Sequence, residues 1–236
     1  MLAWLMEASD AQIYRGRQTM QDYSDIREEV AKLCQKFPGE YWRARDKARE
    51  YPSEFVAALG EAGYLAALIP EEFGGAGLPI SAAAAILEEI QAQGCNGGAV
   101  HAQMYIMGTM LRHGSEEQKS KYLPKIATGE LRLQAFGVTE PTSGTDTLAL
   151  KTVAKRDGDD YVINGQKLWT SRAEHSDLML LLARTTPRDQ VSKRTAGLSV
   201  FLVDMNAALG NGLTIRPIET MMNHSTTELF FDNMRV

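Results

Sequence analysis

FGVTEPTSGTDTLA, residues 136–149, is the stretch around which the rest of the chain is organised. Its apolar start ends in a cluster of small hydroxyl side chains, two carboxylates, a proline and a glycine. Pro141 fixes one φ angle, and Gly144 can adopt backbone geometry that other residues resist. Thr139, Thr145 and nearby backbone N–H groups can then converge on one acceptor-rich ligand. The composition therefore suits a loop that holds a phosphate or the edge of a heteroaromatic ring.

A simpler interpretation fits the same stretch. Asp146 and Thr145 are residue types that satisfy the local backbone of an ordinary polar turn, and composition by itself favours that interpretation. A second run, KLWTS at residues 167–171, has a similar ambiguity. A tryptophan in a β segment, such as Trp169, is more often a core residue than the wall of a ligand site.

Taken together, the two runs favour a ligand site over an ordinary turn, because each matches a known motif and they occur in the order expected for one family. The pattern G-V-T-E-x-x-S-G-T-D-x-x-A at residues 137–149 resembles the signature of the acyl-CoA dehydrogenase family at every specified position. QKLWTS at residues 166–171 resembles the family's following flavin-contact segment, with Asn164-Gly165 as the turn before it. The resemblance covers nearly all of the chain from about Asp25 onward. It implies FAD bound in an extended form between a helical and a β domain, and oxidation of an acyl-CoA thioester to its 2,3-enoyl product.

The resemblance also implies a set of cofactor contacts. The Val138 backbone and the Thr139 hydroxyl would donate to the pyrimidine edge of the flavin, where reduction leaves negative charge. Trp169 would flank the ring system, and the Ser171 hydroxyl, where the family usually has threonine, would lie near N5. The full cofactor-binding set is Phe136, Val138, Thr139, Gly144, Thr145, Trp169, Thr170 and Ser171. Arg172 stands where the family commonly has a small polar residue.

The resemblance places the substrate against a helix at residues 98–113. Gly98, His101, Ala102 and Tyr105 share one face of that helix by the i, i+3, i+4 rule, and Thr145 resembles the position that contacts CoA, so the substrate set is Gly98, His101, Tyr105 and Thr145. His101 invites interpretation as a catalytic base, but no adjacent carboxylate supports it, and a lone helical histidine is usually a packed or capped side chain. Glu140 and Asp146 are expected to orient the loop.

The expected catalytic base lies outside this sequence. In the family the catalytic glutamate belongs to a C-terminal helical bundle, at one of two alternative positions, and we expect it beyond Val236. That bundle also completes the flavin site and builds the oligomer, a homotetramer or homodimer. The 236-residue chain is therefore predicted not to be a competent dehydrogenase by itself. The implied partners are an acyl-CoA and an electron-transferring flavoprotein.

Composition limits the other classes of function. With 44% hydrophobic residues and a net charge of −5, the chain can bury a core and shows neither a nucleic-acid footprint nor an anionic-membrane patch. Cys34 and Cys95 lie far apart and read as buried free thiols of a reducing compartment. The histidines lack metal-ligand spacing, so no metal is expected. The apolar N-terminus is interrupted too early for a signal peptide, and a cytoplasmic location is the default.

The hydrophobic pattern divides the chain into a helical half and a strand half. From about Ser24 to Ala127 apolar residues recur with helical spacing, as at Ile26, Val30 and Leu33. Gly114 is expected as a left-handed helix end, residues 115–118 as a capping box, and residues 69–77 as a structural turn. Strands are predicted at residues 131–138, 150–155, 161–163, 178–183, 198–203 and 228–231, with hairpin turns at 157–159 and 164–165 and a surface loop at 185–195. The prediction is an α+β fold: an all-α domain at residues 1–130, then an antiparallel β-barrel-like domain at residues 131–236.

Three alternatives to a dehydrogenase share this pattern. An acyl-CoA oxidase or a nitroalkane-oxidase-like enzyme would reoxidise the flavin with oxygen. A non-catalytic scaffold would keep the fold without the chemistry. Retention of Thr139, Thr145, Trp169 and Ser171 disfavours the scaffold, because a scaffold needs no hydroxyls at a flavin edge.

Overall fold

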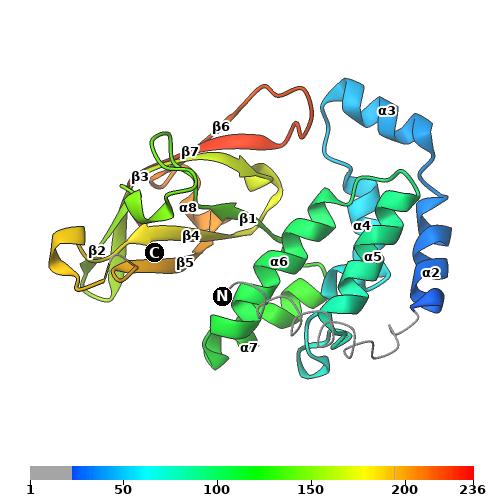
Figure 1. Cartoon of the computed structure of the whole chain (residues 1–236), viewed down its shortest axis with the longest axis horizontal. Helices are drawn as coiled ribbons and strands as arrows, with labels where there is room; N and C mark the ends of the chain where they lie inside the picture. The colour runs from blue at the N-terminus through cyan, green and yellow to red at the C-terminus, as the bar shows by residue number, and fades with distance from the viewer. Residues whose placement is uncertain (1–22, 194) are drawn as a thin grey trace, which may run out of the picture.

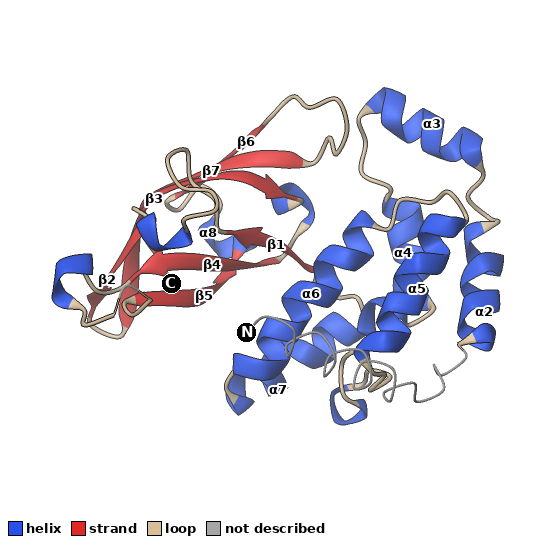
Figure 2. Cartoon of the chain, in the orientation of Figure 1, coloured by secondary structure: helices blue, strands red, loops and turns tan. Residues whose placement is uncertain are grey.

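The computed structural model describes residues 23–193 and 195–236 and places a helical region beside a curled sheet (Figure 1). The helices are α2 Ser24–Cys34, α3 Gly39–Ala48, α4 Ser53–Glu61, α5 Ile80–Ala92, α6 Gly98–His113, α7 Glu116–Ala127 and the short α8 Met205–Ala208. The strands are β1 Leu133–Gly137, β2 Val153–Asp157, β3 Asp160–Ser171, β4 Leu178–Arg184, β5 Leu198–Asp204, β6 Leu213–Pro217 and β7 Thr226–Arg235. The predicted α+β fold, with helices first and a barrel-like sheet second, is confirmed (Figure 2).

The join between α6 and α7 shows one confirmed and one wrong prediction. The Ser115 hydroxyl accepts from the Gln118 N–H, and the Gln118 side chain accepts from the Ser115 N–H, so the capping box is present. Gly114, however, is extended at φ −64° and ψ 144° and not left-handed. Because α7 begins at Glu116, only two residues later, the extended Gly114 places Ser115 directly as the N-cap of α7. A Cβ at Gly114 would lie 2.7 Å from the Met110 carbonyl oxygen, so glycine is needed there for close packing.

The turn at residues 69–77 is held by its own backbone. Gly77 donates to the Ile69 carbonyl at 2.8 Å, and Leu78 donates to the Ala67 carbonyl at 2.8 Å. A Cβ at Gly75 would lie 2.1 Å from the Ile69 oxygen, which leaves room for glycine alone. These contacts make the segment the structural turn that the sequence indicates.

The strands form a mixed sheet in which most pairs are antiparallel. Within the described chain the order is β1-β4-β2-β3-β7-β6, and β5 pairs with β4. The β1–β4 pair is parallel, so the prediction of antiparallel pairing does not hold for every neighbour. The hairpin turn at residues 157–159 joins β2 to β3, but Asn164-Gly165 is not a turn, because β3 continues through it with a register shift against β7. A Cβ at Gly165 would lie 2.5 Å from the Thr152 hydroxyl oxygen, so this glycine lets two strands approach closely.

Apolar residues join the helical region to the sheet. Ile106, Met107 and Met110 of α6 are buried in one cluster with Leu133 of β1 and Leu180 of β4. Separate clusters fill the helical region and the sheet. Figure 1 shows α6 running beside β1, as this packing requires. The joint fixes the position of the outer face of α6 relative to the strands that carry the sequence motifs.

Three further features bear on the class of protein. Cys34 and Cys95 are buried free thiols, as predicted. Among the residues with a described structure, none of the helices is long and apolar enough to cross a membrane. In the same part of the chain, His, Cys, Asp and Glu side chains do not gather in groups of three that could hold a metal ion.

Candidate active site

The two sequence motifs lie side by side. The Lys167 ammonium donates to the Val138 carbonyl oxygen at 2.9 Å, and the Leu168 N–H donates to the Thr139 carbonyl oxygen at 2.8 Å. The end of β1, which carries Phe136, is thereby tied to the middle of β3. These contacts bring Val138 and Thr139 of the first motif next to the segment of β3 that continues to Trp169 and Ser171, and we call the surface shared by the two motifs their common edge.

A buried ion pair holds this junction. Lys167 is fully buried, and its ammonium lies 2.9 Å from a Glu140 carboxylate oxygen. Glu140 also accepts from the N–H groups of Lys151 at 2.6 Å and Thr152 at 2.9 Å, so it closes both ends of the loop as expected. Burial alone would raise the pKa of Glu140, but the hydrogen bonds from Thr152, Lys151 and Lys167 outweigh it and hold the pKa below its ordinary value.

Sequence reasoning gave Lys167 no role of its own. Burial lowers the pKa of its ammonium, against the attraction of Glu140. A signal was present, because period-two alternation from the buried Ile163 places Lys167 on the inward face of β3. A charged residue at such a position requires a buried partner, and Glu140 of the first motif is that partner.

Trp169 projects outward from a strained point of β3. Its φ of 61° is unusual for a residue other than glycine, and the pairing of β3 with β7 is irregular between Lys167 and Thr170. The side chain is 56% exposed. Trp169 is therefore not a core residue, and its indole forms an open wall at the edge that the two motifs share.

Ser171 and Thr170 face different surroundings. The Ser171 hydroxyl oxygen accepts from the Asn223 amide at 3.0 Å, which leaves the hydroxyl hydrogen able to donate. Asn223, between β6 and β7, was not singled out by sequence, and no motif marks it. Thr170 is 2% exposed, so its side chain does not share the open edge with Trp169. The hydroxyl of Thr170 has no hydrogen-bond partner within the described part of the chain.

The loop after β1 closes on itself and exposes its tip. Glu140 and Ser143 exchange backbone hydrogen bonds of 2.9 and 3.1 Å, and the Ser143 hydroxyl donates to the Asp146 carbonyl oxygen at 2.5 Å. Gly144 and Thr145 are exposed. The geometric reason expected for Gly144 is wrong, because its φ is not positive and a Cβ there would meet nothing within 4 Å.

The outer face of α6 lies next to β1. The rings of His101 and Tyr105 are both exposed, with centroids 5.1 Å apart, and Tyr105 lies 6.4 Å from Phe136. Ala102 of the same helix is buried, so only the rings of His101 and Tyr105 are open to a ligand here. Gly98 is at the first turn of the same helix. Three of the four predicted substrate residues therefore lie on one helix beside the predicted cofactor strand, whereas Thr145 lies on the loop.

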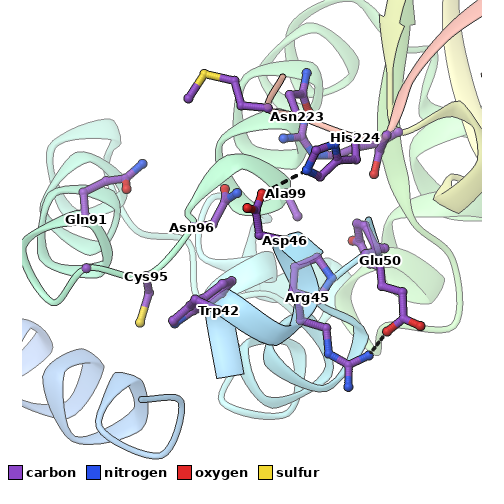
Figure 3. Close-up of a pocket in the computed structure, with 16 residues that line it drawn as sticks. Trp42, Arg45, Asp46, Glu50, Gln91, Cys95, Asn96, Ala99, Asn223 and His224 are labelled. Carbon is purple, nitrogen blue, oxygen red and sulfur yellow. Dashed lines mark hydrogen bonds and ion pairs between the residues drawn. The ribbon is translucent and has the colours of Figure 1, made fainter. Parts of the chain in front are cut away.

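A cavity of about 490 Å³ lies between the helical region and the loop joining β6 to β7. Asp46 of α3 pairs with His224 across it at 2.9 Å, and Arg45 pairs with Glu50 (Figure 3). Its lining residues are Trp42, Arg45, Asp46, Glu50, Tyr51, Pro52, Gln91, Gly94, Cys95, Asn96, Ala99, Arg172 and residues 222–225. The cavity contains none of the predicted cofactor residues, but Arg172 connects it to the neighbouring Ser171.

Comparisons with known proteins agree with this arrangement. A model of the acyl-CoA dehydrogenase N-terminal domain matches residues 20–130, and a model of the acyl-CoA dehydrogenase middle domain matches residues 135–234. The acyl-CoA dehydrogenase FadE26 of Mycobacterium tuberculosis is 36% identical over 78% of this chain and 44% of its own length. The glutaryl-CoA dehydrogenase of Desulfococcus multivorans is 35% identical over 81% of this chain and 49% of its own length.

Solved structures show the same fold. The acyl-CoA dehydrogenase of Geobacillus kaustophilus superposes with a TM-score of 0.82 at 30% identity, covering 93% of this chain and 57% of that protein. The prolyl acyl carrier protein oxidase AnaB superposes with a TM-score of 0.80 at 28% identity, covering 90% and 56%. The chain spans about half the length of the curated relatives it matches. With two domain models matched over most of its residues, this chain belongs to the acyl-CoA dehydrogenase family.

Proposed function

We propose that this protein is an FAD-dependent dehydrogenase that converts an acyl-CoA thioester to its 2,3-enoyl product. The observation that carries the proposal is the junction at Lys167, which joins Val138 and Thr139 to the segment bearing Trp169 and Ser171. A fold alone does not imply a function, so the proposal rests on particular groups. The hydroxyls of Thr139 and Ser171 could hydrogen-bond a flavin, and the exposed indole of Trp169 could pack against its ring.

The residues at this edge fit a flavin. Trp169 offers an exposed aromatic face, Ser171 keeps a hydrogen to donate, and the Thr139 hydroxyl has no partner among residues 23–193 and 195–236. When bound, FAD supplies the hydride acceptor of the reaction. Thr139 and the Val138 backbone would donate toward the edge where negative charge accumulates, and such charge-assisted bonds contribute roughly 1.5–3 kcal/mol each.

The remaining roles follow the family. Gly98, His101 and Tyr105 of α6 and Thr145 of the loop would contact the substrate, and Phe136, Gly144 and Thr170 complete the proposed cofactor set. The base that removes the α-proton would come from the part of the relatives' length that this chain does not span. His101 has no carboxylate hydrogen-bond partner in the described part of the chain, which does not favour it as the base. An electron-transferring flavoprotein is the proposed acceptor, and a homotetramer or homodimer the proposed assembly.

Absorbance spectroscopy tests the cofactor first. The purified protein, extended to the length of its relatives, is expected to be yellow and to lose its flavin absorbance when acyl-CoA is added without oxygen. A colourless protein that also ignores added FAD contradicts the proposal and leaves the scaffold alternative.

An oxidase is the second candidate, since an oxidase is among the proteins with this fold. Stopped-flow mixing of the substrate-reduced protein with air distinguishes the two. Slow reoxidation, with transfer to an electron-transferring flavoprotein, supports the dehydrogenase. Rapid reoxidation in air supports the oxidase.

A further inference from the structure

Arg172 follows Ser171 directly, and its side chain lies against the start of α6. Its φ of 61° is left-handed, and its N–H donates to the Ser225 carbonyl oxygen at 2.7 Å, which fixes the turn. A Cβ placed on Gly98 would lie 2.2 Å from Arg172 Nη2, so the guanidinium lies against the backbone of the first turn of α6. The side chain also lines the cavity of about 490 Å³.

This guanidinium has no carboxylate partner among residues 23–193 and 195–236. The two carboxylates that line the cavity are already paired, Asp46 with His224 and Glu50 with Arg45. The charge is nevertheless half-buried, and burial lowers the pKa of Arg172. A partly desolvated cation without a counter-charge is unfavourable unless something else completes the site.

The surroundings of Arg172 increase the positive potential. The N-terminus of the sixteen-residue helix α6 carries a partial positive charge of its own. The pKa of His175 is lowered chiefly by its burial, and the positive charges of Arg132 and Arg172 lower it further. Burial raises the pKa of both Tyr51 and Tyr105, and the nearby guanidinium opposes that rise. Both side chains are therefore neutral hydrogen-bonding groups beside Arg172. The region is therefore arranged for a negatively charged group that the chain itself does not provide.

We infer that Arg172 determines substrate specificity by binding a carboxylate at the far end of the acyl group, so that the substrate class is the CoA thioesters of dicarboxylic acids. The inference rests on the proposed function. The acyl end is favoured over the phosphates of CoA because Arg172 is next to Ser171 and against α6, whereas the proposed CoA contact Thr145 is on another loop. Arginine suits a carboxylate, since its planar fork offers two parallel N–H donors.

Isothermal titration calorimetry on the FAD-loaded protein, extended to the length of its relatives, tests this. The ligands are β-thia analogues of glutaryl-CoA and pentanoyl-CoA, which have the same length, differ at the end group and cannot lose a β-hydride. A second pair, the analogues of adipyl-CoA and hexanoyl-CoA, covers a longer reach. The expected dissociation constant is about 10- to 100-fold lower for the carboxylate member of at least one pair, as for hydrogen bonds to charged groups.

Three variants test whether Arg172 causes the preference for the carboxylate-ended analogue. Arg172→Gln should abolish that preference while leaving the affinity for the methyl-ended analogue nearly unchanged. Arg172→Lys should keep part of it, because the charge remains and the fork is lost. Arg43→Gln removes an exposed arginine of α3 outside the cavity and should keep the full preference. Thermal unfolding of each variant confirms that it folds.

The outcomes separate this inference from the function on which it rests. Equal affinity of the wild type for both members of each pair overturns the inference and leaves the proposed function standing. So does an equal loss for both members in Arg172→Gln, which would assign Arg172 to the CoA or flavin common to them. Failure of every thioester to bind overturns both.

Discussion

Lys167 is a cation enclosed by protein, and its ammonium depends on Glu140 for its counter-charge. We expect Glu140→Gln to lower the free energy of unfolding by about 3–5 kcal/mol, because it leaves an uncompensated buried charge. Urea unfolding measures this. Asp157→Asn, which breaks an exposed pair with Arg235, is the control and should change stability little.

The double variant Glu140→Gln with Lys167→Met sharpens the same prediction. Removing both charges should recover part of the lost stability, because the penalty comes from the unpaired ammonium. If the two substitutions instead lower the free energy of unfolding additively, the unpaired ammonium is not the source of the penalty and this account is contradicted.

Thr139 bears on the chemistry more than on the fold. Thr139→Val removes a hydroxyl and hardly changes volume, so we expect flavin reduction to slow by about 10-fold, with little change in melting temperature. Rapid-reaction spectroscopy and a flavin potential measurement check this. Thr142→Val, at an exposed position of the same loop, is the matched control. An unchanged rate and potential would remove Thr139 from the site.

His175 makes stability depend on pH. Burial, with Arg132 and Arg172 nearby, lowers its pKa below the ordinary 6.5, so the folded state favours the neutral ring that stacks on Tyr51. Its contribution is present above about pH 6.5 and is lost as the pH falls through the lower folded pKa. His175→Phe keeps a stacked ring and should flatten this dependence in unfolding experiments, whereas His113→Phe, at an exposed position, should not. The same slope in wild type and His175→Phe would refute the assignment.

At the scale of elements, Thr152, the residue before β2, lies closely against β3 at Gly165. Gly165→Ala should lower the free energy of unfolding by about 1–3 kcal/mol, because the new methyl group would overlap Thr152 and displace the strand whose start binds Glu140. FAD affinity should fall with it. Gly158→Asn is the control, since Gly158 lies in an open left-handed turn that asparagine tolerates. Equal stability of Gly165→Ala and wild type would show that the strands can separate there without cost.

The same strand shows where sequence patterns reach their limit. Asn164-Gly165 resembles a hairpin turn locally, and only the partner β7 reveals that it is a bulge in a continuous strand. The parallel pairing of β1 with β4 depends on residues distant in sequence, which periodicity does not report. β6 was missed because Leu213 to Pro217 is short and ends in proline.

Features that depend on neighbouring residues in the sequence were predicted correctly. The bounds of α6 at Gly98–His113 and the cap at Ser115 follow from periodicity and from side chains that bond their own backbone. For the candidate site, the two motifs predicted which segments meet. The alternation of β3 indicates that Lys167 points inward, but which groups it contacts depends on residues distant in sequence, and no motif marks the contact of Asn223 with Ser171.

At the scale of the molecule, we propose the two domains as residues 1–130 and 131–236. Their shared apolar cluster, which includes Met107 and Leu133, argues that they move as one body. The cavity beside Arg172 is bounded by both, so its width would be set by that packing.

We expect the 236-residue chain alone to lack dehydrogenase turnover. A thioester α-proton needs a positioned base, and Glu140, one of the two carboxylates of the first motif, is buried against Lys167. Dye-coupled assays should compare this chain with a form extended to the length of its relatives, at matched FAD occupancy. Equal activity would place the base within residues 1–236, with Glu140 and His101 the first residues to substitute.

The outward turn of Trp169 has an optical consequence. The chain has three tryptophans, and this one presents its indole to solvent at the proposed flavin edge. Flavins absorb at the wavelengths where indole emits, so a bound flavin there would quench Trp169 by resonance energy transfer. With Trp4 and Trp42 changed to phenylalanine, the remaining emission would report the occupancy of the site without any attached dye.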